Sequence, residues 1–342
     1  MNKLRNNVRE NILSLTAYSC ARDQYSQKQG IFLDANENPY GKLNRYPDPY
    51  QNQIKDLLSS YKNTNKENIF IGNGSDQVID LAFRIFCNPE KDNALTFSPT
   101  YGMYQVTADI NNVSLTTLPL NSDFQLDRKK TSPYLADNNT KLILLCSPNN
   151  PTGNLIPKKD IIYLLENFNG IVLVDEAYIE FALEGSALQL IDTYPNLIVA
   201  QTLSKAWALA GARIGIAYSN PYTISLFNKT KPPYNVSALN QKAACKALKK
   251  TSAYLKRKNQ ILKEKEKLYK ALNKLDVVQK IYPSQANFFL VKFKNAKAIY
   301  LSLINLGIIT RDRSNQVTDC LRITVGTKKE NQQLINALKK QA

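Results

Sequence analysis

The sequence predicts an α/β fold, with a large, mostly parallel sheet domain followed by a smaller α+β domain. The chain of 342 residues is long enough for about two domains, and 43% of its residues are hydrophobic, which is ample for a core. Short apolar runs alternate with helical patterns through the middle of the chain, as in sheets whose strands are joined by helices. Several of these runs are apolar on both faces, which is typical of strands that helices cover on both sides.

The individual elements follow from the spacing of the apolar residues. In chain order, apolar runs predict strands over 69–71, 94–97, 113–118, 142–146, 171–174, 197–201 and 214–218. Apolar residues spaced three and four apart predict helices over 76–86 and 158–168, between these strands. After about residue 275 we expect a strand over 288–292, a helix over 296–306, a strand over 321–325 and a final helix over 330–340.

A strongly basic stretch separates the two expected domains. Between Lys246 and Lys270, apolar doublets recur every seven residues among ten basic and two acidic residues. This pattern predicts one long helix with a narrow buried stripe and a solvated basic face. The expected organisation is an N-terminal segment over 1–44 that packs with the small domain, a large domain over 45–238, a long interdomain helix over 239–274 and the small domain over 275–342.

The composition excludes several kinds of chemistry. The chain has no histidine, so it can hold neither a Ser-His-Asp triad, nor a His-ligated metal, nor an imidazole base. Catalysis must then use Lys, Tyr, Asp, Glu or a cofactor. The formal net charge of +17 raises the alternative of a nucleic-acid-binding protein that uses the basic helix. Because nearly half of that charge lies on one solvated helix face, we expect no nucleic-acid partner.

The cysteines and the hydropathy suggest the compartment. The five cysteines are scattered and form no Cys-x-x-Cys pair, which predicts buried thiols and neither a disulfide framework nor a zinc site. No apolar run approaches the roughly 18 residues of a membrane span, and the N-terminus lacks a signal-peptide core. We therefore expect a soluble, cytoplasmic protein with no metal and no membrane partner.

Polar residues follow the predicted strands at five places, where open α/β sheets bind ligands. The glycines of GNGSD (72–76) would let backbone N–H groups face an anion, although Ser75 or Asp76 could equally be an ordinary N-cap. A proline-rich turn places the Asn150 amide at the sheet edge. Asp175 ends a buried strand, where a carboxylate is costly unless it meets a cation or several donors; the alternative is a solvated loop aspartate.

The last two places carry cations. Lys205 follows two hydroxyl residues, Thr202 and Ser204, in a loop that enters small apolar residues, with Arg213 eight residues later. A lysine held among neutral groups loses part of its charge and becomes an amine nucleophile, although most lysines are solvated surface residues. Arg311, Arg313 and Arg322 bracket the last strand, where a planar guanidinium suits carboxylate or phosphate and exposed salt bridges are the alternative.

Together these motifs resemble the fold-type I, pyridoxal-phosphate-dependent enzymes of the aspartate aminotransferase superfamily. Within it, the chain is similar to the histidinol-phosphate aminotransferase family. The strings that carry the resemblance are LDANENPYG (33–41), NRYPDPY (44–50), GNGSD (72–76), SPTYGMY (98–104), CSPNNPTG (146–153), VLVDEAYIEF (172–181), TLSKAWALAGARIGI (202–216), KPPYNVSALNQ (231–241), RDRS (311–314) and LRITVGT (321–327).

The resemblance implies pyridoxal 5'-phosphate as cofactor and assigns its ligands. Lys205 would bind the cofactor aldehyde and carry a proton, and Asp175 would pair with the ring nitrogen. Asn150 and Tyr178 would hold the ring's phenolic oxygen, while Tyr101 would stack on the ring. The cofactor phosphate would be bound by Ser75, Asp76, Thr202, Ser204, Arg213 and, from the neighbouring subunit of a homodimer, Tyr46.

The resemblance also implies the substrates. The expected reaction transfers the amino group of L-glutamate to imidazole acetol phosphate, giving 2-oxoglutarate and L-histidinol phosphate in histidine biosynthesis. Arg322 would bind the α-carboxylate of glutamate, and Arg311 and Tyr18 would contact the phosphate or the distal carboxylate. Asn36 and Asn287 would line the substrate side. An aromatic or broad amino-acid aminotransferase, or a phosphothreonine-type decarboxylase, is the alternative.

Overall fold

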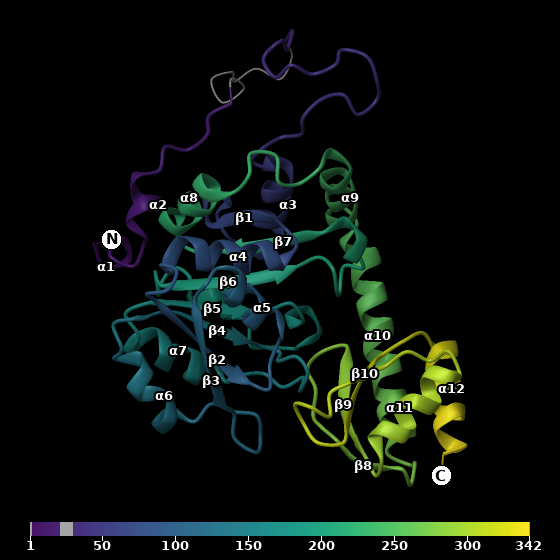
Figure 1. Cartoon of the computed structure of the whole chain (residues 1–342). Coiled ribbons are helices and arrows are strands. Elements are labelled where there is room, and N and C mark those ends of the chain that lie inside the picture. Colours follow the sequence, from purple (N-terminus) through teal and green to yellow (C-terminus); the bar gives the residue numbers. More distant parts are fainter. Residues whose placement is uncertain (1, 21–29, 342) are drawn as a thin grey trace.

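The chain forms a large α/β unit and a smaller unit joined by a long helix (Figure 1). The structure is a computed structural model that describes residues 2–20 and 30–341. Seven strands of the large sheet lie in the order β1-β7-β6-β5-β4-β2-β3, and only β7 runs antiparallel to its neighbours. They are β1 (Ile69–Asn73), β2 (Asn93–Ser98), β3 (Ser114–Pro119), β4 (Thr140–Cys146), β5 (Ile171–Asp175), β6 (Leu197–Thr202) and β7 (Ile214–Tyr218). The predicted mostly parallel sheet is confirmed.

Helices cover both faces of the large sheet. Along β5, Val172 and Val174 belong to one buried cluster, whereas Ile171 and Leu173 belong to a second cluster on the opposite face. This is why the central strands are apolar at every position. The helices of this unit are α3 (Asn52–Lys62), α4 (Ser75–Phe86), α5 (Met103–Ile110), α6 (Arg128–Leu135), α7 (Lys158–Asn167), α8 (Pro221–Thr230) and α9 (Ala238–Leu248), with short 3-10 turns η2 (Lys66–Asn68), η3 (Ile179–Phe181), η4 (Ala187–Leu190) and η5 (Ala210–Ala212).

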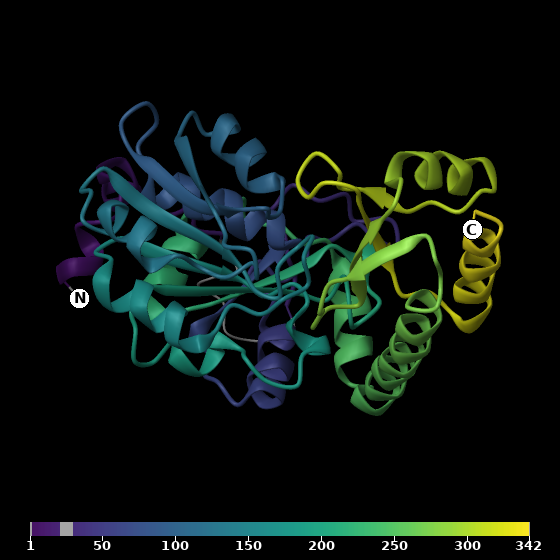
Figure 2. The ribbon, with the colours of Figure 1, turned by 90° about the horizontal axis from the view of Figure 1, so that it is seen from below.

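The small unit is a four-stranded antiparallel sheet with helices on one face. Its strands, in the order β10-β11-β9-β8, are β8 (Val278–Ile281), β9 (Phe288–Phe293), β10 (Arg311–Asp312) and β11 (Cys320–Thr324). Helices α11 (Ala296–Asn305) and α12 (Lys328–Lys339) lie on the side away from the large unit (Figure 2). Their core includes Phe289, Val291 and Ile323, so the alternate residues of β9 and β11 face the large unit.

The predicted single helix over 239–274 is wrong in one respect. It consists of α9 and α10 (Thr251–Leu272), separated at Lys249 and Lys250. Lys250 has a non-helical ψ of 53°, and α10 begins at Thr251, a residue type that favours helix starts over helix interiors. The break lets α9 pack on α3 while α10 continues to β8 and α12 of the small unit. The strands β8 and β10 were not predicted, because both are short and at least partly exposed.

The N-terminal segment was expected to pack with the small domain, but its residues 4–13 contact the large unit instead. Helices α1 (Asn2–Arg5) and α2 (Glu10–Ser14), with the turn between them, place Leu4, Val8 and Ile12 in a buried cluster with residues of α4 and α8. The backbone N–H of Arg9 also donates to Ile85 O of α4 at 3.0 Å. The apolar residues of α1 and α2 pack against α4 and α8, because these two helices cover the large sheet and offer an apolar outer side.

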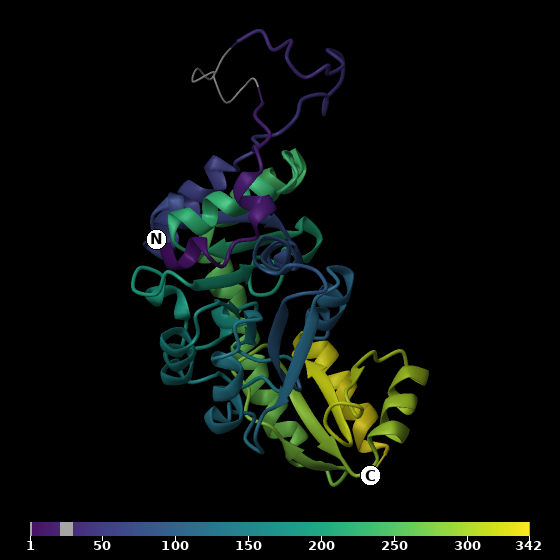
Figure 3. The same ribbon diagram turned by 60° about the vertical axis from the view of Figure 1, so that its left-hand side comes forward.

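The described part of the segment after residue 30 projects from the body of the molecule. It lies apart from both sheets in two views (Figures 1 and 3), and Ile31 is 91% exposed. No helix among residues 2–20 and 30–341 is both long and apolar enough to cross a membrane. The five cysteines, all of them within the described chain, are buried and none is in a disulfide.

Candidate active site

A cavity of about 150 Å³ opens at the carboxyl ends of β4, β5 and β6. The strand register places Cys146 of β4 beside Asp175 of β5, and Asp175 beside Ala200 of β6. Polar residues that follow neighbouring parallel strands are thereby brought to one edge. Ten of the eleven residues predicted to bind the cofactor line this cavity: Ser75, Asp76, Tyr101, Asn150, Asp175, Tyr178, Thr202, Ser204, Lys205 and Arg213.

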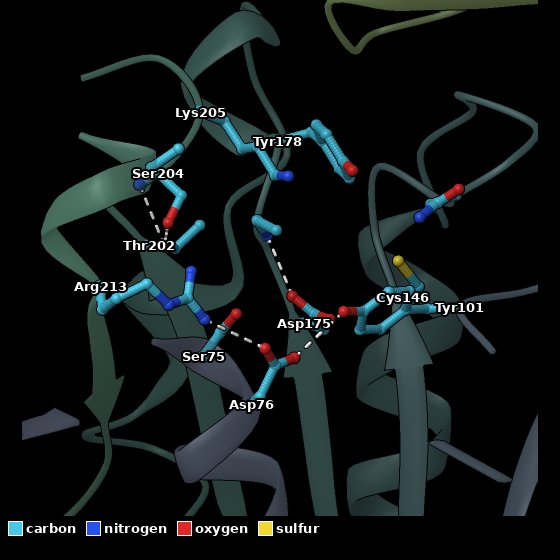
Figure 4. A pocket seen from close by; sticks show the side chains of 13 residues that line it. Ser75, Asp76, Tyr101, Cys146, Asp175, Tyr178, Thr202, Ser204, Lys205 and Arg213 are labelled. Atoms are coloured by element: carbon cyan, nitrogen blue, oxygen red, sulfur yellow. Dashed lines mark hydrogen bonds and ion pairs between the residues drawn. The ribbon is translucent and has the colours of Figure 1, made fainter. Parts of the chain in front are cut away.

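Asp175 lies at the base of the cavity and is only 2% exposed (Figure 4). Its Oδ2 accepts a 3.0 Å hydrogen bond from the hydroxyl of Tyr104, and its Oδ1 accepts a 3.1 Å bond from the backbone N–H of Ala177. Burial nevertheless raises the pKa of Asp175 to about 6, because these two donors offset only part of the desolvation. No cation forms a salt bridge with this carboxylate within the described residues.

Lys205 extends into the cavity from the loop that follows β6 (Figure 4). Its Nζ lies 5.6 Å from the centre of the Tyr178 ring. Trp207 anchors the loop, because its buried ring stacks on Tyr254 of α10 with centroids 3.9 Å apart. The pKa of Lys205 is lowered mainly by partial burial and secondly by repulsion from Arg322. The lowered pKa increases the fraction of nucleophilic free amine.

An anion cradle lies on another side of the cavity, at the start of α4. Gly74 has a φ of 77°, and its N–H donates to Arg213 O at 2.9 Å, which joins the helix start to the end of η5. The side chain of Arg213 returns to Asp76, with Nη2 and Oδ2 3.3 Å apart. A Cβ at Gly215 would lie 2.1 Å from the carbonyl carbon of Gly74, so this approach of the two backbones requires glycine.

Hydroxyl groups and helix geometry complete the cradle. Thr202 donates to Ile214 O at 3.0 Å and accepts from the backbone N–H of Ser204 at 3.1 Å, which fixes both hydroxyls beside Arg213 (Figure 4). The first N–H groups of α4, at Ser75 and Asp76, have no acceptor within the helix because no turn precedes them. The arrangement therefore combines free N–H groups, two hydroxyls and a guanidinium, which together suit a phosphate.

Aromatic and amide side chains surround the space between Asp175 and Lys205. The Tyr101 hydroxyl donates to Asp76 Oδ1 at 3.1 Å, and its ring meets the Tyr104 ring edge-on at a centroid distance of 5.6 Å. Tyr178 packs edge-on against Phe288 of β9, with centroids 5.0 Å apart. The small sheet thus packs against a residue that lines the cavity, through a side chain that faces the large unit.

The predicted substrate arginines lie on that same small sheet. Arg322 of β11 donates through Nη1 to Asn150 Oδ1, so its guanidinium contacts a residue that lines the cavity, although neither Arg322 nor Arg311 lines the cavity itself. Arg311 pairs directly opposite Arg322 across the β10–β11 ladder, which puts the two side chains on one face of the sheet. Asn287 does not line the cavity; its backbone carbonyl accepts from Val325 N–H at 2.9 Å, next to Phe288.

Three predicted residues lie away from the cavity of their own chain. Asn36 and Tyr46 line a separate surface pocket, where Tyr46 stacks on Tyr234 with centroids 4.3 Å apart. Tyr18 is 68% exposed beside Lys231 in another pocket. A single chain does not bring these three side chains to Lys205.

Some residues of the site were not predicted. Cys146, Ala177 and Ala210 also line the cavity, and Tyr104 supports Asp175 from behind. Cys146 is the last residue of a strand that ends beside Asp175, and this position could have identified it as a residue that lines the cavity. Nothing local in the sequence distinguishes Tyr104 from other aromatic core residues, since its partner is 71 positions away.

Comparisons with known proteins agree with this geometry. The sequence model of the family "Aminotransferase class I and II" matches residues 14–338. Histidinol-phosphate aminotransferase of Flavobacterium psychrophilum is 47% identical in an alignment of 341 residues that covers 98% of this chain and 98% of that one. Two solved structures are similar at 25% identity. They are histidinol-phosphate aminotransferase of Sinorhizobium meliloti in complex with pyridoxal-5'-phosphate (TM-score 0.79, 97% of this chain and 96% of that one) and L-threonine-O-3-phosphate decarboxylase of Porphyromonas gingivalis (TM-score 0.73, 87% and 90%).

The two solved structures also confirm the fold, because they share the arrangement of both units over most of the chain. The family match covers nearly all of the described residues, and the curated relative is similar over 98% of its length. The chain therefore belongs to the class I and II aminotransferase family.

Proposed function

We propose that the protein is a pyridoxal-phosphate-dependent aminotransferase that moves the amino group of L-glutamate to imidazole acetol phosphate, releasing 2-oxoglutarate and L-histidinol phosphate. The observation that carries the proposal is the shared cavity of Asp175 and Lys205, a buried carboxylate without a cation partner among the described residues and a lysine of lowered pKa. When bound, pyridoxal phosphate supplies an aldehyde that condenses with amines and a ring that withdraws electrons from the substrate Cα.

The residues of the cavity fit this cofactor at three points. A carboxylate that is 2% exposed needs a positive partner, and a protonated pyridine nitrogen would be one. The cradle formed by the α4 N-terminus, Thr202, Ser204 and Arg213 suits a phosphate. Lys205 reaches the space between these two sites, where the aldehyde carbon would lie (Figure 4). A single small molecule with a basic ring, a phosphate and an aldehyde meets all three requirements.

Lys205 would act first as the amine that binds the cofactor and then as the base that moves the proton at the substrate Cα. Its lowered pKa supports this role, because a general base must be neutral when it accepts the proton. Asp175 would keep the ring nitrogen protonated, and Asn150 and Tyr178 would orient the ring from its other edge. Arg322, hydrogen-bonded to Asn150, would bind the substrate carboxylate beside these groups.

The choice of substrate rests on the relatives and on the arginines. The 47% identical relative of Flavobacterium psychrophilum is named for histidinol phosphate, a phosphorylated amine. Arg311 and Arg322 lie on the face of the small sheet that covers the cavity, so the substrate side is positively charged. Both glutamate and histidinol phosphate carry anionic groups that match this charge.

The test is turnover with purified protein, pyridoxal phosphate, L-histidinol phosphate and 2-oxoglutarate. We expect glutamate to form in amounts equal to the histidinol phosphate consumed. Transamination of tyrosine or phenylalanine, with no reaction of histidinol phosphate, would instead identify an aromatic or broad aminotransferase. Release of carbon dioxide from phosphothreonine would identify a decarboxylase like that of Porphyromonas gingivalis.

A homodimer with shared active sites is part of the proposal. The described segment after residue 30 exposes the apolar side chains Ile31, Leu33, Tyr40 and Leu43, which favours burial against a second copy. In that arrangement Tyr46 would reach the anion cradle of the partner. Sedimentation at micromolar concentration is expected to give the mass of two chains. A monomer with full activity would contradict shared sites.

A further inference from the structure

Three arginines gather on one face of the small sheet. Arg311 lies opposite Arg322, and the backbone N–H of Arg313 donates to Cys320 O at 2.9 Å, which continues the ladder by one pair. Side chains two residues apart on a strand point to the same face, so Arg313 follows Arg311 toward the large unit. Arg322 already contacts Asn150 at the cavity, which places the three guanidinium groups on its substrate side.

These three charges lack an acidic partner in the described part of the chain. None of them takes part in a salt bridge between residues that the structure describes. Asp312, between two of them, instead accepts a hydrogen bond from the Ser314 N–H at 2.8 Å. Burial, followed in size by repulsion from Arg322 and Arg311, lowers the pKa of Arg313, and Tyr178 and Asp312 offset only part of this effect.

Arg313 is the one of the three arginines that has a buried side-chain nitrogen without a partner among the described residues. Its Nε is buried and has no hydrogen-bond partner in the structure, although buried guanidinium nitrogens normally have one. The turn that carries it is held in place: Gln316 and Val317 N–H both donate to Arg313 O, and Gln316 Nε2 lies 3.5 Å from Thr100 O beside Tyr101. A guanidinium on a held turn, with a buried nitrogen that no described residue bonds, is suited to bind an anion.

We propose that Arg313 is a specificity-determining residue that binds the phosphate group of a phosphorylated amino substrate. The inference rests on the proposed function and deepens it. The two carboxylates of glutamate need two arginines, and Arg322 and Arg311 can each bind one of them bidentately. A phosphate carries nearly twice the charge of a carboxylate and a third terminal oxygen. A third arginine therefore adds to the binding of a phosphate ester and little to that of glutamate.

The experiment compares Arg313→Gln and Arg313→Lys with the unaltered holoenzyme. The two half-reactions are measured separately, with L-glutamate and with L-histidinol phosphate, and inorganic phosphate is tested as a competitive inhibitor. Lys294→Gln is the matched control, because it removes a charge at the opposite end of β9 from Phe288, roughly 20 Å from the cavity at 3.3 Å per residue.

In Arg313→Gln we expect kcat/KM for histidinol phosphate to fall by roughly 10- to 100-fold and phosphate inhibition to weaken to a similar degree. The glutamate half-reaction should change by less than about threefold, Arg313→Lys should recover part of the loss, and Lys294→Gln should match the unaltered enzyme. Equal losses with both substrates, or none with either, would overturn the inference.

The proposed function can fail separately. If the unaltered enzyme does not turn over histidinol phosphate, the substrate assignment is wrong whatever the variants do. Calorimetric titration of inorganic phosphate into the cofactor-loaded protein then still tests Arg313. Affinity that falls in Arg313→Gln and not in Lys294→Gln supports a phosphate-binding role, and unchanged affinity overturns it.

Discussion

The hydroxyl of Tyr104 donates a 3.0 Å hydrogen bond to Oδ2 of Asp175, and both side chains are buried. Tyr104 lies on α5, one turn from Tyr101, which lines the cavity on the other side of the carboxylate. A hydrogen bond to the charged form of an acid favours ionisation. Tyr104 therefore keeps Asp175 more acidic than burial alone would allow, and it fixes the direction of the carboxylate.

Removal of that hydroxyl should weaken both the fold and the cofactor site. In Tyr104→Phe we expect the free energy of unfolding without cofactor to fall by about 1–3 kcal/mol at pH 8, since a buried carboxylate loses a donor. The affinity for pyridoxal phosphate should fall by roughly tenfold. Tyr218→Phe is the control, because the Tyr218 hydroxyl is buried without a hydrogen-bond partner and its loss should be neutral or stabilising. Equal effects of the two variants in urea unfolding and in cofactor titration would contradict this role.

Stability should depend on pH through two adjacent carboxyls. Burial raises the pKa of Asp175 to about 6 and that of Glu176 to about 7, both above their unfolded values near 4. Between the unfolded pKa near 4 and the native pKa of each group, the native state binds more protons than the unfolded state. The free energy of unfolding therefore falls as pH rises from about 4 to about 7. Carboxyl groups whose pKa is lowered in the native state change the free energy of unfolding at lower pH, below about 4.5.

Glu176→Gln tests this dependence. Glu176 accepts hydrogen bonds from Ala187 N–H, Ser186 Oγ and Gln201 Nε2, which a neutral amide can keep in part. We expect the difference in unfolding free energy between pH 5 and pH 8, measured in urea without cofactor, to shrink by about 2 kcal/mol. The exposed Glu184→Gln should leave the difference unchanged. A pH profile of Glu176→Gln that overlays the unaltered one would refute the assignment.

Lys205 should be the lysine that binds the cofactor. Lys265 is the matched control, because burial lowers its pKa to about 8 yet its Nζ donates to Ser284 O, outside the cavity. With one equivalent of pyridoxal phosphate and borohydride reduction, we expect peptide mass spectrometry to find the adduct on Lys205. The adduct should vanish in Lys205→Ala and persist in Lys265→Ala. An adduct that survives the first substitution would place the covalent site elsewhere.

The anion cradle should depend on the close approach of the backbone at Gly215 to the backbone at Gly74 and Ser75. In Gly215→Ala the new Cβ would lie 2.3 Å from Ser75 N, so the start of α4 must move. We expect cofactor affinity to fall by more than about tenfold and the unfolding free energy by about 2 kcal/mol or more. Gly102→Ala, whose Cβ meets nothing within 4 Å, should change neither quantity. Unchanged binding of pyridoxal phosphate by Gly215→Ala in a fluorescence titration would show that the cradle tolerates the shift.

The sequence could predict elements whose signal is local. Strand β5 is apolar at every position before Asp175, and α4 follows Gly74 with apolar residues three and four apart, so both could be located from spacing alone. The strands β8 and β10 could not be predicted, because β8 is partly exposed and β10 has only two residues. The division between α9 and α10 was missed because the basic surface pattern continues through Lys249 and Lys250.

The sequence by itself determined the mostly parallel sheet, its helices and the positions where polar residues follow buried strands, since each depends on neighbours a few residues apart. Only the tertiary structure decided that Tyr104 supports Asp175, that Arg322 reaches Asn150 from 172 positions away, and that residues 2–14 pack on the large unit. These contacts depend on strand order and on how one sheet faces the other. They are set by the burial of whole surfaces, which no local pattern records.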